Sequence, residues 1–148
     1  MATRSYIFIA LSKEDFGKEV QFDKNLHKVA EFNHQPPVVK IENKKYMGIY
    51  HHWDGYPSGV GLTLINEYKD KEKIINLLSG GDASIIIDNV IQYHSWRNEN
   101  WEHVKPKFVD KIIDDEDYLY LFKNGKWYFK SWNSKLTDLE EYLKNDEE

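Results

Sequence analysis

The dipeptide Asn124-Gly125 is the feature that most constrains how this chain can fold. Asn and Gly tolerate the positive φ angles of a type I′ turn, and that turn matches the twist of two antiparallel strands. Aromatic residues alternate with other residues on both sides of the dipeptide. The sequence therefore predicts a C-terminal aromatic β-hairpin. Its expected facing pairs are Phe122 with Trp127 and Tyr120 with Phe129.

Short strand and helix patterns are intermixed along the rest of the chain. Strands are predicted, from β-branched and aromatic content, over residues 3–11, 37–41, 46–53 and 85–91. Short helices are predicted after Asp23, from Pro57, after Asp70 and after Thr137. In the last of these, Thr137 and Glu140 have the spacing of a capping box. This mixture predicts a single α+β domain over residues 1–148, with a mainly antiparallel sheet and three or four short helices.

Composition and charge exclude several classes of protein. The chain has no cysteine, which excludes disulfides and thiolate metal sites. Its 25 acidic and 20 basic side chains give a net charge of −5, whereas proteins that grip a nucleic-acid backbone usually carry a basic excess. The first apolar run, residues 6–11, is too short for a signal peptide or a membrane span. We therefore expect a cytoplasmic protein that binds neither membranes nor nucleic acid directly.

The segment 50–61 concentrates polar and aromatic groups at the end of a predicted strand. It contains two histidines, an aspartate, three aromatic rings, a proline and three glycines. Gly55 and Pro57 indicate a sharp turn from the strand into a helix. A helix start preceded by glycine can hold a phosphate through its free amides. The segment is therefore the leading candidate for a ligand site.

Within this segment, His52 and Asp54 are two residues apart and could project to the same side of the strand. A carboxylate beside an imidazole can orient it as a general base, so these two would be the catalytic pair if the protein is an enzyme. Asp54 could instead cap the helix that begins near Pro57. Strand alternation places His51 and His52 on opposite faces, and no HExxH spacing exists. We expect no metal and no cofactor.

Two other segments carry groups suited to a phosphorylated ligand. Arg4 and Arg97 are the only arginines, and a guanidinium can bind phosphate through two parallel hydrogen bonds. The rings of Trp53, Tyr56, Tyr93 and Trp96 could stack on a nucleobase. We expect Arg97 and His52 to face one pocket. The predicted ligand-binding residues are Arg4, His52, Trp53, Asp54, Tyr56, Tyr93, His94 and Arg97.

The order of these motifs resembles a family of small tailed-phage and prophage proteins with an N-terminal MATRS and a (C/H)HWDGYP block. The matching segments are Met1-Ala2-Thr3-Arg4-Ser5, His52-Trp53-Asp54-Gly55-Tyr56-Pro57, Gly81-Asp82-Ala83-Ser84 and Gly125-Lys126-Trp127-Tyr128, with a looser match at Tyr93-His94 and Arg97. His51 stands where the family usually has Cys, which argues against an obligatory thiol nucleophile there. The segment 12–45 is longer than the corresponding segment of the family and is a candidate insertion. The resemblance implies a phage or prophage source and a role in countering host defence.

Three functions are compatible with these features. The leading hypothesis is a non-enzymatic counter-defence protein that binds and sequesters a small phosphorylated signal of nucleotide type in the host cytoplasm. The second is an inhibitor that binds a host defence protein directly, as an anti-CRISPR does, through an aromatic or acidic face. The third is a small phosphodiesterase-type hydrolase. The 15% aromatic content also allows a homo-oligomer, whose subunit number the sequence does not determine.

Overall fold

The Asn124-Gly125 turn joins β8 (Tyr118–Lys123) to β9 (Lys126–Ser131), as predicted. The two turn residues have φ angles of 53° and 78°, the positive values of a type I′ turn. Phe122 pairs with Trp127 and Tyr120 pairs with Phe129 in the antiparallel register. The hairpin prediction is therefore confirmed in both turn and register.

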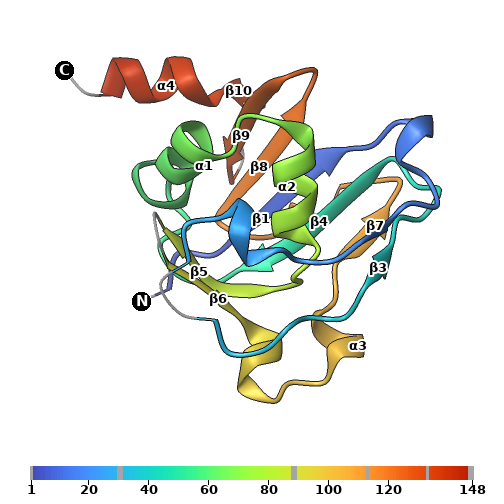
Figure 1. The fold of residues 1–148 in the computed structure, drawn as a ribbon. Coiled ribbons are helices and arrows are strands. Elements are labelled where there is room, and N and C mark those ends of the chain that lie inside the picture. Colours follow the sequence, from blue (N-terminus) through green and yellow to red (C-terminus); the bar gives the residue numbers. More distant parts are fainter. Residues whose placement is uncertain (1, 30–31, 88–89, 113, 133, 147–148) are drawn as a thin grey trace.

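The computed structural model describes residues 2–29, 32–87, 90–112, 114–132 and 134–146. Met1 of the N-terminal motif and residues 30–31 of the candidate insertion lie outside this part of the chain. The main sheet has eight strands in the order β10-β9-β8-β1-β4-β5-β6, with β7 paired to β4 (Figure 1). Its remaining strands are β1 (Ser5–Ala10), β4 (Tyr46–His51), β5 (Ala83–Ile87), β6 (Val90–Tyr93), β7 (Lys107–Val109) and β10 (Thr137–Asp138).

The sheet is mixed, and antiparallel pairs predominate. Parallel pairing joins β1 to β8 and β4 to β5, whereas the other recorded neighbours in this sheet are antiparallel. Together with the helices, this confirms a single α+β domain. The segment predicted as one strand over 85–91 is instead a hairpin of β5 and β6, and residues 88–89 between them lie outside the described chain. β3 (Val39–Lys40) pairs with β2 (Glu19–Val20) in a separate two-stranded sheet.

The helices are short, and helical turns begin near the four predicted positions. The α-helices are α1 (Leu62–Glu67), α2 (Lys71–Leu78), α3 (Trp101–Val104) and α4 (Leu139–Asp146). Single turns of other helix types are η1 (Lys13–Asp15), η2 (Lys24–Leu26), η3 (Pro57–Gly61) and η4 (His94–Arg97). Of these helices, α3, η1 and η4 were not predicted. Asp70 caps α2 by accepting the Lys73 N–H at 2.9 Å, as predicted. The capping prediction for α4 is wrong in its residue, because Asp138 accepts the Glu141 N–H and Thr137 belongs to β10.

The main core lies between the sheet and the helices α1, α2 and α4. Alternate residues of β1 and β4, including Ile7 and Ile49, are fully buried on this face against Leu64 and Leu77. Figure 1 shows α2 lying across β1 and β4. A second, smaller apolar cluster around Phe8 lies on the opposite face. We call that opposite side of β1 and β4 the open face.

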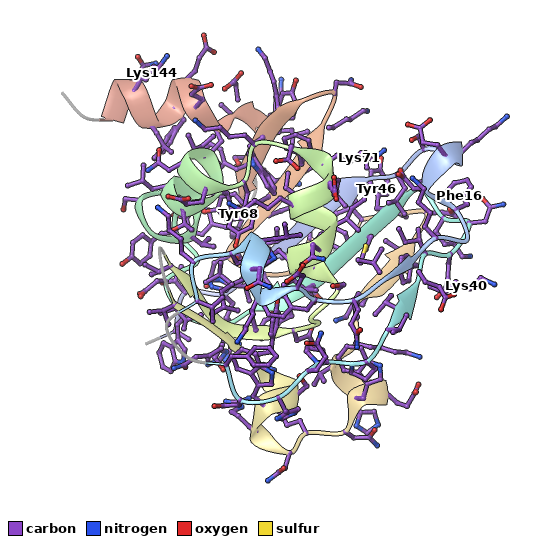
Figure 2. All side chains as sticks on the ribbon, viewed as in Figure 1. Phe16, Lys40, Tyr46, Tyr68, Lys71 and Lys144 are labelled. Atoms are coloured by element: carbon purple, nitrogen blue, oxygen red, sulfur yellow. The ribbon has the colours of Figure 1, made fainter. Side chains whose placement is uncertain are left out.

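Residues 12–45 are packed into the helix side of the domain. Phe22 is 1% exposed and belongs to the main core. His27 lies 2.9 Å from both the Tyr68 hydroxyl and the Asn76 amide oxygen. Figure 2 labels Tyr68 beside α2, where this contact forms. Apolar and polar contacts thus attach this segment to α2.

Candidate functional site

Strand alternation separates the two adjacent histidines, as predicted. His51 points into the core and is fully buried. Its Nε2 accepts the Ile86 N–H at 3.0 Å, so the proton of the neutral ring is on Nδ1, which lies 3.2 Å from the Ser5 hydroxyl. Burial lowers the pKa of His51 to about 3. This histidine is a neutral structural group at pH 7.

His52 points to the open face, where its partner is a tyrosine. Its Nδ1 lies 2.6 Å from the hydroxyl of Tyr50, which is two residues earlier on the same side of β4. Trp53 packs edge-on against the imidazole, with 4.8 Å between ring centroids, and remains 45% exposed. Burial raises the pKa of Tyr50, so its hydroxyl stays protonated. The Tyr50–His52 pair presents an imidazole in a fixed position at the protein surface.

Neither predicted role of Asp54 is found in the structure. Asp54 has a φ of 57°, a left-handed conformation that carries the chain out of β4, and its carbonyl accepts the Val60 N–H. No side-chain cap is recorded at the start of η3, and the recorded partner of His52 is Tyr50. The prediction that Asp54 caps the helix or orients His52 is therefore wrong.

Gly55 is required for a close approach between backbones. Its N–H donates to the Thr3 carbonyl at 2.9 Å, and its carbonyl accepts the Tyr120 hydroxyl at 2.7 Å. A Cβ at this position would lie 2.6 Å from the Thr3 oxygen. The turn after β4 is thus fixed between the N-terminal strand and the aromatic hairpin, which explains why it can hold His52 and Trp53 in place.

A buried carboxylate lies beside Tyr50. β4 pairs with β7 as far as Gly48 and with β5 from His51 onward. Asp82 fills the interval, because its Oδ1 accepts the Tyr50 N–H at 2.9 Å and the Lys107 ammonium at 3.1 Å. Burial raises the pKa of Asp82, and Lys107 opposes this shift. The Asp82–Lys107 pair therefore closes the gap in the sheet beside Tyr50.

His94 brings η4 against the same tyrosine. Its ring centroid lies 6.2 Å from that of Tyr50, and its backbone N–H donates to the Asp82 backbone carbonyl at 2.9 Å. Burial and the nearby Arg97 charge lower the pKa of His94, so the ring is mainly neutral at pH 7. We call Tyr50, His52, Asp82, His94 and Lys107 the Tyr50 cluster.

Arg97 joins this cluster through Glu99. The guanidinium Nη2 and Nε lie 2.5 Å and 3.1 Å from one carboxylate oxygen, Glu99 Oε2. The same oxygen lies 3.7 Å from His94 Nδ1. Two nitrogen-bearing side chains thus converge on a single anionic oxygen at the surface. Contacts through His94 and Tyr50 connect the Arg97–Glu99 pair to His52. The cavity that Arg97 lines is not lined by His52, so the predicted shared pocket is not found there.

Arg4 approaches the cluster from the start of β1. Arg4 is exposed. Burial raises the pKa of Tyr50 and of Glu116, and the positive charge of Arg4 opposes this rise. Its backbone N–H donates to Asp117 at 3.0 Å. The acidic run 114–117 therefore lies along one border of the open face. Tyr6 belongs to this border, since burial and the Asp115 and Glu116 carboxylates raise its pKa to about 12.

The remaining predicted residues divide into exposed and buried rings. Tyr56 is 39% exposed in the turn after β4. Tyr93 is 0% exposed and donates its hydroxyl to the Leu77 carbonyl, so the prediction that it offers a stacking face is corrected. Trp96 remains partly exposed beside it. Tyr93 belongs to the core that supports η4.

Sequence reasoning missed four members of the site. Tyr50, Lys107 and Glu99 were not proposed as ligand residues, and Asp82 was not linked to Tyr50. Tyr50 could have been found from the two-residue spacing to His52, because alternate strand residues share a face. Lys107 and Glu99 could not, because their positions depend on how β7 and the residues after η4 pack.

No known family model, curated protein or solved structure matches this chain. Across the described residues, no three His, Cys, Asp or Glu side chains gather in a way that could hold a metal ion. None of the described helices has the length and apolar character needed to cross a lipid bilayer.

Proposed function

We propose that this protein binds a small phosphorylated ligand at the Tyr50 cluster, with Arg97 as the main phosphate contact. The observation that carries the proposal is the convergence of Arg97 and His94 on Glu99 Oε2. A carboxylate oxygen held by a guanidinium has the charge and hydrogen-bonding character of a phosphoryl oxygen. Glu99 is exposed and lies in the loop after η4, so a phosphate can take its place.

The surrounding groups suit the rest of such a ligand. His52 and Tyr50 offer polar hydrogen-bonding groups next to His94. Trp53 provides a half-exposed aromatic face, and Arg4 contributes a second guanidinium near Tyr50. A phosphorylated ligand is recognised well where donors and an aromatic surface converge.

A sequestering role is the form of this activity that the resemblance to phage proteins favours. A protein that captures a signalling nucleotide of a host defence system needs tight binding and no turnover. Binding by fixed side chains on a rigid sheet provides tight binding without chemistry. The proposed role is therefore a phage counter-defence protein that removes a phosphorylated signal in the host cytoplasm.

Two substitutions at one ion pair test the proposal in opposite directions. Calorimetry against a panel of cyclic and linear nucleotides first identifies a binding nucleotide. Arg97→Ala is expected to weaken its binding by about 1.5–3 kcal/mol, the usual contribution of a hydrogen bond to a charged group. Glu99→Ala is expected to strengthen binding, because it removes the carboxylate that competes with the phosphate.

The matched control is Glu102→Ala. Glu102 is also an exposed carboxylate paired with a cation, Lys105 at 2.7 Å, but it lies in α3. This variant should bind like the wild type. If Arg97→Ala also binds like the wild type, the phosphate site is elsewhere. If no nucleotide binds and a host protein co-purifies, the inhibitor hypothesis replaces this one.

A second candidate function is favoured by the two histidines around Tyr50. His52 and His94 both pack against this ring, and an acid and a base on either side of a phosphodiester could cleave it. This arrangement replaces the His52–Asp54 pair as the catalytic set of a small phosphodiesterase. Mass spectrometry of the nucleotide after incubation distinguishes the two functions, since a sequestering protein returns its ligand unchanged.

A further inference from the structure

We infer that the cavity beside Arg97 is a nucleobase subsite, so that the phosphorylated ligand is a nucleotide. This inference rests on the proposed function and specifies its ligand. The cavity has a volume of about 240 Å³, and Asn33, Gln92, Trp96 and Arg97 are among the residues that line it. Pockets for drug-sized ligands measure roughly 300–1,000 Å³. A volume below this range suits a single flat ring system.

Trp96 gives the cavity a rigid aromatic wall. Its indole N–H donates to the His34 carbonyl at 2.7 Å. Its ring is held edge-on against Phe32 and Tyr93, with centroid separations of 5.8 Å and 5.4 Å. An indole fixed in this way stacks on a base without losing side-chain entropy. Stacking on an aromatic side chain is the usual means by which proteins hold a nucleobase.

Two amides supply the polar groups that a base edge requires. Asn33 and Gln92 are exposed and line the same cavity from different segments. Among the described residues, neither amide has a hydrogen-bond partner within the protein. An amide offers both a donor and an acceptor, which matches the paired donor and acceptor edges of nucleobases. Both side chains line the cavity and are exposed, so a ligand bound there can contact them.

Arg97 connects the cavity to the phosphate position. It lines the cavity and also holds Glu99 Oε2 at 2.5 Å, the oxygen that His94 approaches. A base in the cavity would place the sugar beside Arg97 and the phosphate at the position now taken by the Glu99 carboxylate. The guanidinium of Arg97 therefore links a base subsite to a phosphate subsite. The hydroxyl of Ser95, next to Trp96, is buried without a partner among the described residues.

The test compares probes that carry only one of the two groups. Calorimetry is run with adenosine, guanosine, cytidine and uridine 5′-monophosphates, with ribose 5-phosphate, and with the four free nucleosides. At least one nucleoside monophosphate is expected to bind about tenfold or more tightly than ribose 5-phosphate, the order of magnitude of one stacked base. The double variant Asn33→Ala, Gln92→Ala keeps the Trp96 wall but removes the hydrogen bonds to the base edge, so it should reduce this difference and leave the affinity for ribose 5-phosphate unchanged. Asn145→Ala, an exposed amide on α4, is the control and should have no effect.

Each outcome separates the subsite from the proposed phosphate site. If ribose 5-phosphate binds as tightly as every monophosphate, the base subsite is wrong and the phosphate site stands. If nucleosides bind and lose affinity in the double variant, while the phosphate adds nothing, the base subsite stands and the phosphate proposal fails. If the preference for a base is as large in the double variant as in the wild type, the base is held elsewhere and the inference is overturned. Circular dichroism verifies that the variant is folded.

Discussion

His51 shows how one buried residue sets the pH range of the fold. Burial holds its pKa near 3, compared with 6.5 for an unperturbed histidine. Below pH 6.5 the unfolded chain binds a proton that the folded chain cannot accept, so stability falls as the pH falls from 6.5 towards 3. Each pH unit in this window costs about 1.4 kcal/mol. We expect the free energy of unfolding to drop by about 2 kcal/mol from this residue between pH 7 and pH 5.

Urea titrations of the wild type and His51→Gln at the two pH values measure this contribution. The variant has no imidazole at this position, so its stability should depend less steeply on pH, whatever its stability at pH 7. His27 contributes in the same direction, because burial also lowers its pKa, and its effect remains in both proteins. Equal pH dependence in the wild type and the variant would show that His51 does not have a lowered pKa in the folded protein.

At the scale of elements, the start of α4 depends on one aspartate. Asp138 Oδ1 accepts the Glu141 N–H at 3.1 Å, whereas the Thr137 hydroxyl donates to the Lys135 carbonyl. Asp138→Ala is expected to lower the free energy of unfolding by about 1 kcal/mol, the usual contribution of an N-cap. Thr137→Ala should cost less than half as much. Thermal unfolding of the two variants distinguishes this cap from the predicted capping box.

Local sequence signals predicted the elements better than the site. The β8–β9 hairpin and the Asp70 cap depend on neighbouring residues alone, so sequence was enough to find them. The Asp54 and Tyr93 predictions failed because backbone direction and burial are set by distant packing. The contact of His94 with Tyr50 depends on β5 and β6 forming a hairpin beside β4. Because the sequence pattern predicted a single strand over residues 85–91, this contact could not be predicted.

At the scale of the whole molecule, residues 12–45 and the sheet should unfold together. Phe22 from this segment is buried against Tyr93 with 5.2 Å between ring centroids, and so connects it to β6. Phe22→Ala is expected to reduce the free energy of unfolding by about 3–5 kcal/mol. Circular dichroism and calorimetry should both show one transition at a lower temperature. Loss of only part of the signal would indicate that the segment is an independent insertion.

The central position of β1 has a consequence for how the chain is made. β1 pairs with β4 on one side and in parallel with β8 on the other, with Ser5 opposite Tyr118. β1 is synthesised before β8, so one of its edges has no pairing partner until β8 has emerged from the ribosome. Pairing between such distant segments slows folding, and an exposed apolar strand edge promotes aggregation. The nascent chain is therefore most vulnerable before β8 emerges, and mutations that weaken β8 should reduce the yield of folded protein in cells.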